Sequence, residues 1–154
     1  MALVTTKELL LKAQRGGYAV GAFNVENMEM MQAVIAAAEA EGLPVILQTT
    51  PSTLKYASTA VFAAMAEAMA KDATVPVAMH LDHGSSFELC KQGALDGYTS
   101  LMIDGSKYDF EENIAITKKV VDYAHERGVV VEAELGKLAG IEDDVNVSES
   151  DAMY

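Results

Sequence analysis

The sequence predicts an α/β protein built on a parallel sheet, because three observations agree. Short apolar runs alternate with longer runs whose apolar residues repeat at helical spacing. Polar or acidic residues stand at or near the end of each successive short run. The 154 residues, 51% of them hydrophobic, are enough to bury one sizeable core. We therefore expect residues 1–154 to form a single domain.

Each expected helix has a start or stop signal of its own. Gly16 and Gly17 end the first helix, and Asn27 caps a second that ends before Gly42. Asp109 caps the last helix, and Gly128 follows its end. Helices are expected over residues 5–16, 28–41, 59–70, 87–95 and 110–127. Strands are expected over residues 18–24, 45–48, 77–82, 100–104 and 129–134.

Four strand–helix units and a fifth strand imply parallel strands joined by right-handed crossovers, which leaves two architectures. A doubly wound sheet binds its ligand at a switch point, usually beside a glycine-rich first turn, and residues 24–27 contain no glycine. A (β/α)8 TIM barrel instead carries functional residues at the ends of many strands. The chain shows that second pattern at Asn24, Gln48, Asp82, His83, Asp104, Glu132 and Glu134. Because a barrel needs roughly 250 residues, we expect this chain to supply strands 1 to 5, with the C-terminal part absent.

Composition argues against several classes of partner. The chain has 11 basic and 23 acidic side chains, a net charge of -12 that repels nucleic acid and anionic membranes. It shows no membrane-spanning run and no signal-peptide pattern, and its single cysteine cannot form an internal disulfide. Cys90 shares a helical face with Phe87 and Ala94, which predicts a small core residue rather than a nucleophile. We therefore expect a cytoplasmic protein with no nucleic-acid or membrane partner.

The third expected strand ends in His80-Leu81-Asp82-His83. Alternation along a strand places His80 and Asp82 on the same side, with His83 at the start of the loop. Two imidazoles and a carboxylate there could hold a cation or a reacting carbonyl. We favour Asp82 as a general acid or base beside His83 as a metal ligand. The alternative is that Asp82 caps the turn at residues 84–86.

The fourth and fifth strands end in further acidic residues. Alternation points Glu132 and Glu134 to one face, where two inward carboxylates need a cation, an arginine or a shared proton. The alternative is an exposed face with solvated charges. Asp104 could be a metal ligand, an acceptor for a histidine, or a cap on residues 105–106. His125, between polar residues of the last helix, is expected at the surface.

Four ordered segments carry a resemblance to a known family. They are residues 17–24, 80–87, 100–106, and 131–136 continuing to 140–144. Over its whole length the chain resembles the N-terminal part of the class II, zinc-dependent ketose-bisphosphate aldolases. The resemblance implies a (β/α)8 barrel that binds Zn²⁺ and cleaves fructose- or tagatose-1,6-bisphosphate to dihydroxyacetone phosphate and glyceraldehyde 3-phosphate. It also implies a homo-oligomer of carbohydrate metabolism, such as glycolysis.

The resemblance also implies catalytic and metal-binding roles. His83 matches one of three zinc-binding histidines, and Asp82 matches the acid that handles the proton at the aldehyde oxygen. Asp104 and Glu134 match positions that hold a second or alternative metal position. Glu142, in the loop after the fifth strand, matches a mobile glutamate that moves the proton at the dihydroxyacetone phosphate carbon.

Four further residues are expected around these groups. Asn24 and Gln48 match substrate-side positions at the ends of the first two strands. His80 and Glu132 are expected to support the ligands rather than to bind metal or substrate themselves.

Two departures from the family pattern bear on activity. Ala139-Gly140 stands where the family often has two glycines. The remaining zinc histidines and the phosphate-binding loop find no match in this chain. An alternative function is therefore a noncatalytic fragment, or a split half barrel that needs a C-terminal piece for activity and self-associates without it. Fructose and tagatose bisphosphate stay open as substrates, although residues 49–51 look more like the tagatose type.

Overall fold

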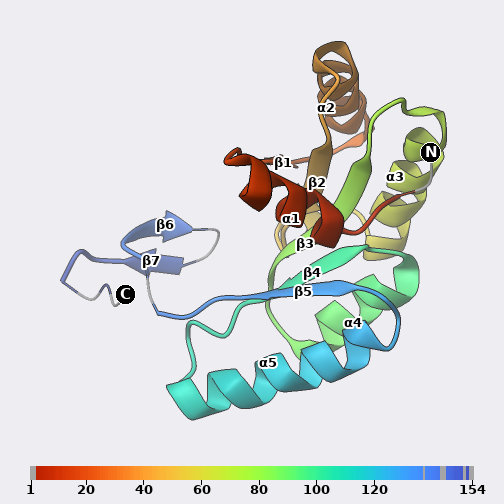
Figure 1. Cartoon of the computed structure of the whole chain (residues 1–154). Helices are drawn as coiled ribbons and strands as arrows, with labels where there is room; N and C mark the ends of the chain where they lie inside the picture. The colour runs from red at the N-terminus through yellow and green to blue at the C-terminus, as the bar shows by residue number, and fades with distance from the viewer. Residues whose placement is uncertain (1–2, 137, 143–144, 151, 153–154) are drawn as a thin grey trace.

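The computed structural model describes residues 3–136, 138–142, 145–150 and 152, without the side chains of residues 141, 142, 145 and 146. Figure 1 shows a sheet covered by helices, with a short hairpin beyond its last strand. The strands of the sheet are β1 Gly21–Asn24, β2 Val45–Thr49, β3 Val77–Gly84, β4 Ser100–Ile103 and β5 Val130–Ala133. The α-helices are α1 Thr6–Gly16, α2 Met28–Glu41, α3 Thr59–Asp72, α4 Phe87–Asp96 and α5 Phe110–His125.

The strand order confirms the barrel topology over the doubly wound alternative. All four pairings in the sheet are parallel, and the order is β1-β2-β3-β4-β5, so each strand lies beside its neighbour in the chain. A doubly wound sheet would reverse this order at its switch point. Strands β1 and β5 are the two edges of the sheet. The chain is thus an open run of five strand units of a barrel.

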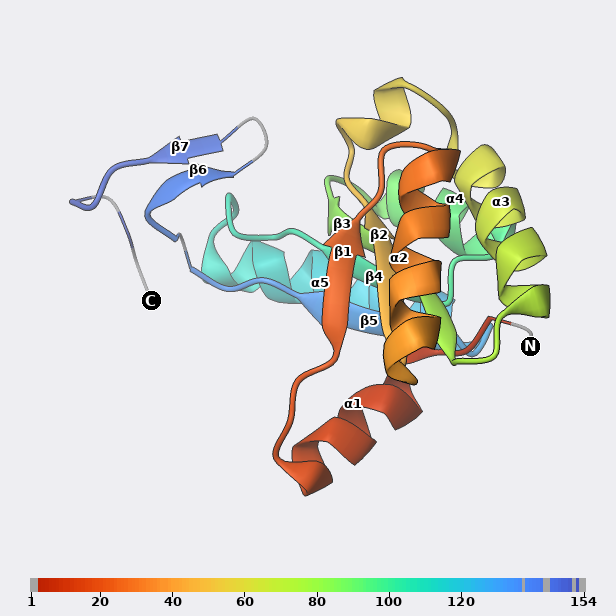
Figure 2. The same cartoon turned by 90° about the horizontal axis from the view of Figure 1, so that it is seen from above.

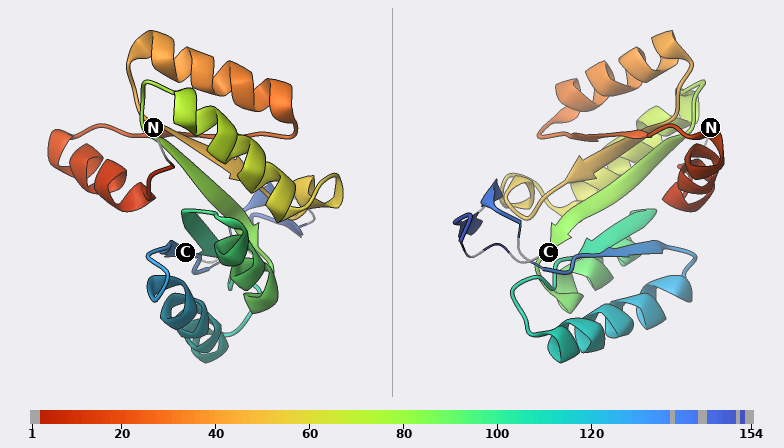
Figure 3. Two further views of the ribbon diagram at one scale, coloured as in Figure 1. Left: turned by 90° about the vertical axis from the view of Figure 1, so that its right-hand side faces the viewer. Right: turned by 60° about the vertical axis from the view of Figure 1, so that its left-hand side comes forward.

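The helices form a layer outside the sheet. Figure 3 shows α2 and α3 along one part of the sheet and α4 and α5 along the next, so that the helical layer bends around the strands. Helix α1 lies apart from this layer and crosses the end where the strands begin (Figure 2). Thr6 of α1 donates a buried hydrogen bond of 3.2 Å to Ser100 at the start of β4. The carboxyl ends of the strands therefore stay open to ligands.

The core fills the space between the sheet and this helical layer. Its largest fully buried side chains include Met31, Leu47, Phe62, Met79, Leu81, Tyr98, Leu101 and Ile103. Cys90 of α4 is also buried there, and burial raises the pKa of its thiol to about 12, which confirms the expected core residue. No helix in the described part of the chain is both long and apolar enough to cross a membrane.

The predicted capping signals explain the helix boundaries. The Asn27 side chain accepts the Met30 amide at 2.9 Å, and Asp109 accepts the Glu112 amide at the same distance. Gly42 adopts the left-handed conformation, with φ of 64°, that ends a helix. His125 is exposed at the end of α5, as expected.

The structure differs from the sequence prediction at three places. Strand β1 begins at Gly21 rather than at residue 18, because the Tyr18 amide still donates to Ala13 in the cap of α1. A 3-10 turn, η1 at Thr53–Lys55, follows β2. Strands β6 at Gly140–Glu142 and β7 at Val145–Val147 form a separate antiparallel hairpin. The sequence did not predict these two strands, because three residues are too few to show the alternating apolar pattern of a strand.

Candidate functional site

The predicted polar residues meet at the carboxyl edge of the sheet. The parallel register places Asn24 beside Gln48 and Gln48 beside His80. The remaining candidates follow in the same direction along β3, β4 and β5. One edge of the sheet thus collects residues from five strands that are far apart in the sequence.

The end of β3 has an irregular backbone that presents His83. His83 has φ of 49°, the one non-glycine residue with positive φ in the described part of the chain. The register between β3 and β4 shifts from Leu81 to Gly84. A Cβ atom on Gly84 would lie 2.3 Å from the Met102 carbonyl oxygen, so glycine lets the two strands approach this closely. Strained residues of this kind occur frequently at functional sites.

His83, Asp104 and Glu134 form a compact, partly buried cluster. Nδ1 of His83 lies 3.4 Å from Oδ2 of Asp104 and 3.6 Å from Oε2 of Glu134. One ligand atom from each of the three residues lies within 4.8 Å of the other two. The structure therefore brings together the three residues that the sequence assigned to a metal.

Asp104 fills two of the roles considered from the sequence. Its Oδ1 atom accepts hydrogen bonds from the Ser106 amide at 3.0 Å and the Ser106 hydroxyl at 2.6 Å, so it caps the following turn. Its Oδ2 atom faces His83. The turn thereby fixes the carboxylate with one oxygen directed at the imidazole.

The charges of the cluster are complementary. Partial burial alone would lower the pKa of His83, but the carboxylates of Asp82, Asp104 and Glu134 outweigh it and raise that pKa. Partial burial would likewise raise the pKa of Asp104, but the hydrogen bonds from Ser106 and His83 lower it. The neutral imidazole of His83 can bind a metal ion, whose positive charge would then face the neighbouring carboxylates.

The donor set fits zinc. Imidazole nitrogen and carboxylate oxygen are both zinc ligands, with bonds of about 2.0–2.2 Å in tetrahedral sites, which separates neighbouring ligand atoms by about 3.3–3.6 Å. The separations of 3.4 and 3.6 Å from His83 to its two acidic partners match that spacing. The cluster leaves at least one ligand position for a further group.

A second set of hydrogen bonds joins Asn24, Gln48 and Asp82. Nε2 of Gln48 donates to Oδ1 of Asn24 at 2.6 Å and to Oδ2 of Asp82 at 2.7 Å. The hydroxyl of Ser86, rather than Asp82, accepts the Leu89 amide as the N-cap of α4. The substrate-side and proton-transfer candidates therefore lie in direct contact across three strands.

His80 and Glu132 lie close enough to His83 and Asp82 to interact with their charges. His80 is 5% exposed, its Nδ1 pairs with the Ser100 hydroxyl at 2.8 Å, and its Nε2 lies 3.9 Å from Glu132. Burial, helped by the charge of His83, lowers the pKa of His80 to about 4, so its imidazole is neutral near pH 7. Desolvation and the charge of Asp82 raise the pKa of Glu132.

The two glutamates at the end of β5 differ in exposure. The Glu132 side chain is 60% exposed, whereas that of Glu134 is 15% exposed. The expected solvated face therefore applies to Glu132 only.

Glu142 cannot be placed in the same way. Its backbone belongs to β6, but its side chain lies outside what the structure describes, as do Asp143 and Asp144 of the same segment. Its catalytic role stays a prediction.

Sequence reasoning missed Asn113 of α5. This side chain is 7% exposed and donates from Nδ2 to the Glu134 carbonyl oxygen at 2.7 Å. It shares the buried face of α5 with Val120 and Ala124. A polar residue at a position that helical spacing predicts to be buried was the available signal.

Comparison with known proteins gives one consistent result. The family model described as class II fructose-bisphosphate aldolase matches residues 4–154. A fructose-bisphosphate aldolase of Staphylococcus aureus is 52% identical over 148 residues, covering 94% of this chain and 52% of the relative. Its counterpart in Thermus caldophilus is 53% identical over 151 residues, covering 98% and 49%. The chain thus spans about half the length of these curated relatives.

Solved structures show the same likeness. The YdjI aldolase of Escherichia coli K12 superposes with a TM-score of 0.83 at 41% identity, covering 91% of this chain and 53% of that one. A protein described as a putative fructose-1,6-biphosphate aldolase from Coccidioides immitis has a TM-score of 0.83 at 34% identity, covering 91% and 49%.

Proposed function

Because the chain belongs to the class II fructose-bisphosphate aldolase family, we propose that it takes part in zinc-dependent, reversible aldol cleavage of a ketose 1,6-bisphosphate. The products are dihydroxyacetone phosphate and glyceraldehyde 3-phosphate. The observation that carries the proposal is the cluster of His83, Asp104 and Glu134 beside Asp82 at the carboxyl edge of the sheet. In barrel enzymes this edge is where the active site lies.

In this proposal His83 is one of three histidines that would hold the zinc ion, and Asp104 and Glu134 would hold a second or alternative metal position. When bound, zinc would polarise the ketone oxygen as a Lewis acid and so stabilise developing negative charge. His83 must give up its proton to bind the metal, and the lost imidazolium charge is then replaced by the cation. Further ligands implied by the resemblance come from outside this chain, since neither His80 nor His125 matches them.

Asp82 is the proposed proton donor and acceptor at the aldehyde oxygen. Its neighbour Gln48 holds the carboxylate through the 2.7 Å hydrogen bond, and Asn24 in turn holds the Gln48 amide. A fixed carboxylate next to the metal position can transfer a proton without first reorienting. Asn24 and Gln48 are also the proposed contacts to the substrate. Glu142 is the proposed base at the carbon of dihydroxyacetone phosphate.

The active form is proposed to include a C-terminal piece that completes the barrel. Apolar side chains are exposed at both edges of the sheet: Phe23 and Leu43 near β1, and Phe110, Ile114 and Leu135 near β5. Exposed apolar surface at sheet edges commonly marks a contact with another segment or chain. In the alternative function, this chain is a noncatalytic half barrel until that piece binds, and it self-associates through the same edges.

The test compares the chain with and without a second half. Purified residues 1–154, confirmed by mass, are assayed for cleavage of fructose and tagatose 1,6-bisphosphate with EDTA or added zinc. The same assay is run after mixing with the C-terminal half of the Staphylococcus aureus relative. We expect cleavage only in the mixture. This activity should depend on zinc and should be lost in His83→Ala.

Two results would contradict the proposal. Zinc-dependent cleavage by residues 1–154 alone would show that the chain needs no second half. Cleavage in the mixture that survives both EDTA and His83→Ala would remove the metal cluster from the reaction.

A further inference from the structure

Asn113 is a polar side chain in the packed layer between α5 and the sheet. A buried amide without partners destabilises the fold, so the hydrogen bonds of such a group show what holds it there. Its Oδ1 atom accepts from the Thr117 hydroxyl at 3.1 Å, one turn along α5. Its Nδ2 atom donates to the Glu134 carbonyl oxygen at 2.7 Å. The carbonyl can only accept, and this fixes the orientation of the amide.

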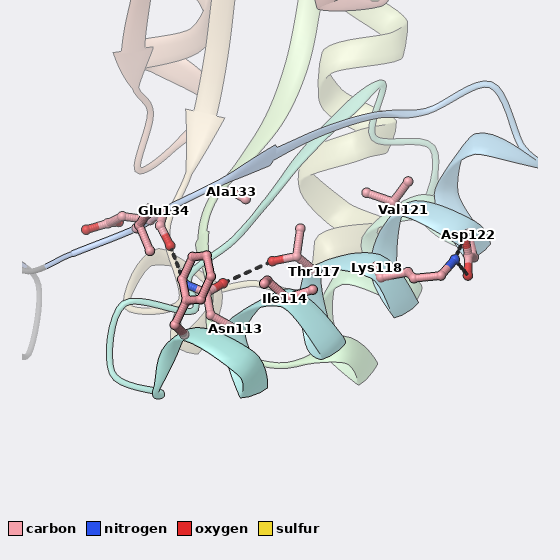
Figure 4. Close-up of a pocket in the computed structure, with 10 residues that line it drawn as sticks. Asn113, Ile114, Thr117, Lys118, Val121, Asp122, Ala133 and Glu134 are labelled. Carbon is pink, nitrogen blue, oxygen red and sulfur yellow. Dashed lines mark hydrogen bonds and ion pairs between the residues drawn. The ribbon is translucent and has the colours of Figure 1, made fainter.

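Figure 4 shows how this amide meets the segment after β5. The Glu134 carbonyl points toward Asn113, whereas the Glu134 side chain points away from α5. Glu134 lies one residue beyond Ala133, the last residue of β5. The hydrogen bond from Asn113 therefore holds the backbone at Glu134, just beyond the residues that the sheet holds by its own hydrogen bonds.

The same amide also touches the segment after β4. A Cβ atom on Gly105 would lie 2.2 Å from Oδ1 and 2.5 Å from Cγ of Asn113. The amide group is therefore packed directly against the Gly105 backbone. Gly105 follows Asp104, whose carboxylate faces His83. One side chain of α5 thus contacts the backbone at or next to both acidic members of the metal cluster.

We propose that Asn113 is a positioning residue that sets the distances of the Asp104 and Glu134 carboxylates from His83, and thereby the affinity of the cluster for zinc. The inference rests on the proposed zinc function of the cluster. A metal site requires its ligands within about 0.5 Å of the productive geometry. Both carboxylates stand on backbone just beyond a strand, and Asn113 joins the two segments to one rigid helix.

Three variants separate positioning from general stability. Asn113→Leu keeps the number and branching of the side-chain heavy atoms and removes both hydrogen bonds. Gly105→Ala does not change residue 113, but its added methyl group displaces the Asn113 amide. The control is Thr99→Val, which also removes two hydrogen bonds: the Thr99 hydroxyl donates to the Met79 carbonyl at 3.2 Å and accepts from the Met79 amide at 3.0 Å. Thr99 lies just before β4, at the opposite end of the sheet.

The first readout is zinc affinity, measured by competition with a chromogenic chelator on folded residues 1–154. Losing a group that orients a metal ligand typically weakens binding about 10- to 100-fold. We expect a loss of that size in Asn113→Leu and Gly105→Ala, and none in Thr99→Val even where its thermal unfolding temperature falls equally. Zinc binding in both Asn113→Leu and Gly105→Ala that equals the parent would overturn the inference.

A crystal structure of the Gly105→Ala or Asn113→Leu chain is the second readout and needs no metal. We expect at least one carboxylate to move away from its parent position, 3.4 or 3.6 Å from Nδ1 of His83. An unchanged cluster would overturn the inference. Zinc binding unaffected by His83→Ala would instead reject the cluster as the metal site. In that case, or if the parent chain binds no zinc without the ligands from outside it, the crystal structure decides on Asn113 alone.

Discussion

Gly84 is the position where one added methyl group should separate β3 from β4. In Gly84→Ala the new Cβ would lie 2.3 Å from the Met102 carbonyl oxygen and 2.8 Å from Sγ of Cys90. Ordinary contacts of this kind are 3.4 Å or longer. The strands must therefore part by about 1 Å, because a backbone oxygen in a sheet cannot rotate away as a side chain can.

Two terms set the size of the effect. Overpacking a well-packed core costs about 1–3 kcal/mol, and a contact with backbone belongs at the upper end. Separation also weakens the 3.0 Å hydrogen bond from the Asp104 amide to the Gly84 carbonyl. That bond adds about 1 kcal/mol, so we expect a total loss of about 3–4 kcal/mol in the free energy of unfolding.

Urea unfolding followed by circular dichroism measures this loss. The control is Gly93→Ala, another buried glycine, whose added Cβ would meet the flexible end of Leu101 at 3.0 Å. Inside a helix alanine is more stable than glycine by about 1 kcal/mol, and this gain offsets the steric cost of that contact. We expect little change for Gly93→Ala. A loss below about 1 kcal/mol in Gly84→Ala, the low end for overpacking, would refute the argument that close approach of the strands requires glycine.

Three other measurements test the site and the core. In the complete enzyme, Asp82→Ala should keep its zinc and lose about 10²–10⁴ in cleavage rate, because a general acid contributes that much; equal rates would remove Asp82 from the mechanism. In the native chain, Cys90 should resist thiol reagents at pH 8 and react after unfolding in urea, since it is 1% exposed with a thiol pKa of about 12; rapid native labelling would contradict its burial. Without metal, the raised pKa of His83 stabilises the fold at pH values below about 6.5, the pKa of an unfolded histidine, and this stability is lost as the pH rises through the folded pKa. The lowered pKa of Asp104 has the opposite effect, because the stability it adds is lost as the pH falls below about 3.9. Unfolding free energies of parent and His83→Gln, measured from pH 4 to 9, should therefore converge at high pH, and a constant difference would contradict the pairing.

Periodicity and capping were sufficient to predict the sheet, because these signals are local. Asn27, Asp109 and Gly42 act within one turn of their helices, so their roles can be read from neighbouring residues. The apolar runs of β2 to β4 are buried on both faces in the structure, as their composition predicts. Strand β1 came out shorter because the cap of α1 uses the residues before it.

Features that depend on contacts across the fold were not predictable. Asp104 and Glu134 could be assigned to a metal, but their distances from His83 depend on a register shift and a positive φ that no residue type announces. Asn113 looked like an ordinary helix residue until its amide was seen against Gly105. The different exposure of Glu132 and Glu134 could not be predicted either, because alternation along a strand places both side chains on the same face.

The sequential strand order has a consequence for how the chain acquires its shape during synthesis. In the five-stranded sheet each strand after β1 pairs with the strand made just before it, so the sheet can grow in the direction of translation without waiting for distant sequence. The exception is α1, whose Thr6 must wait for Ser100, 94 residues later. We expect the first helix to dock only after β4 has emerged from the ribosome. The earliest part of the chain to be made would then be among the last to take its place.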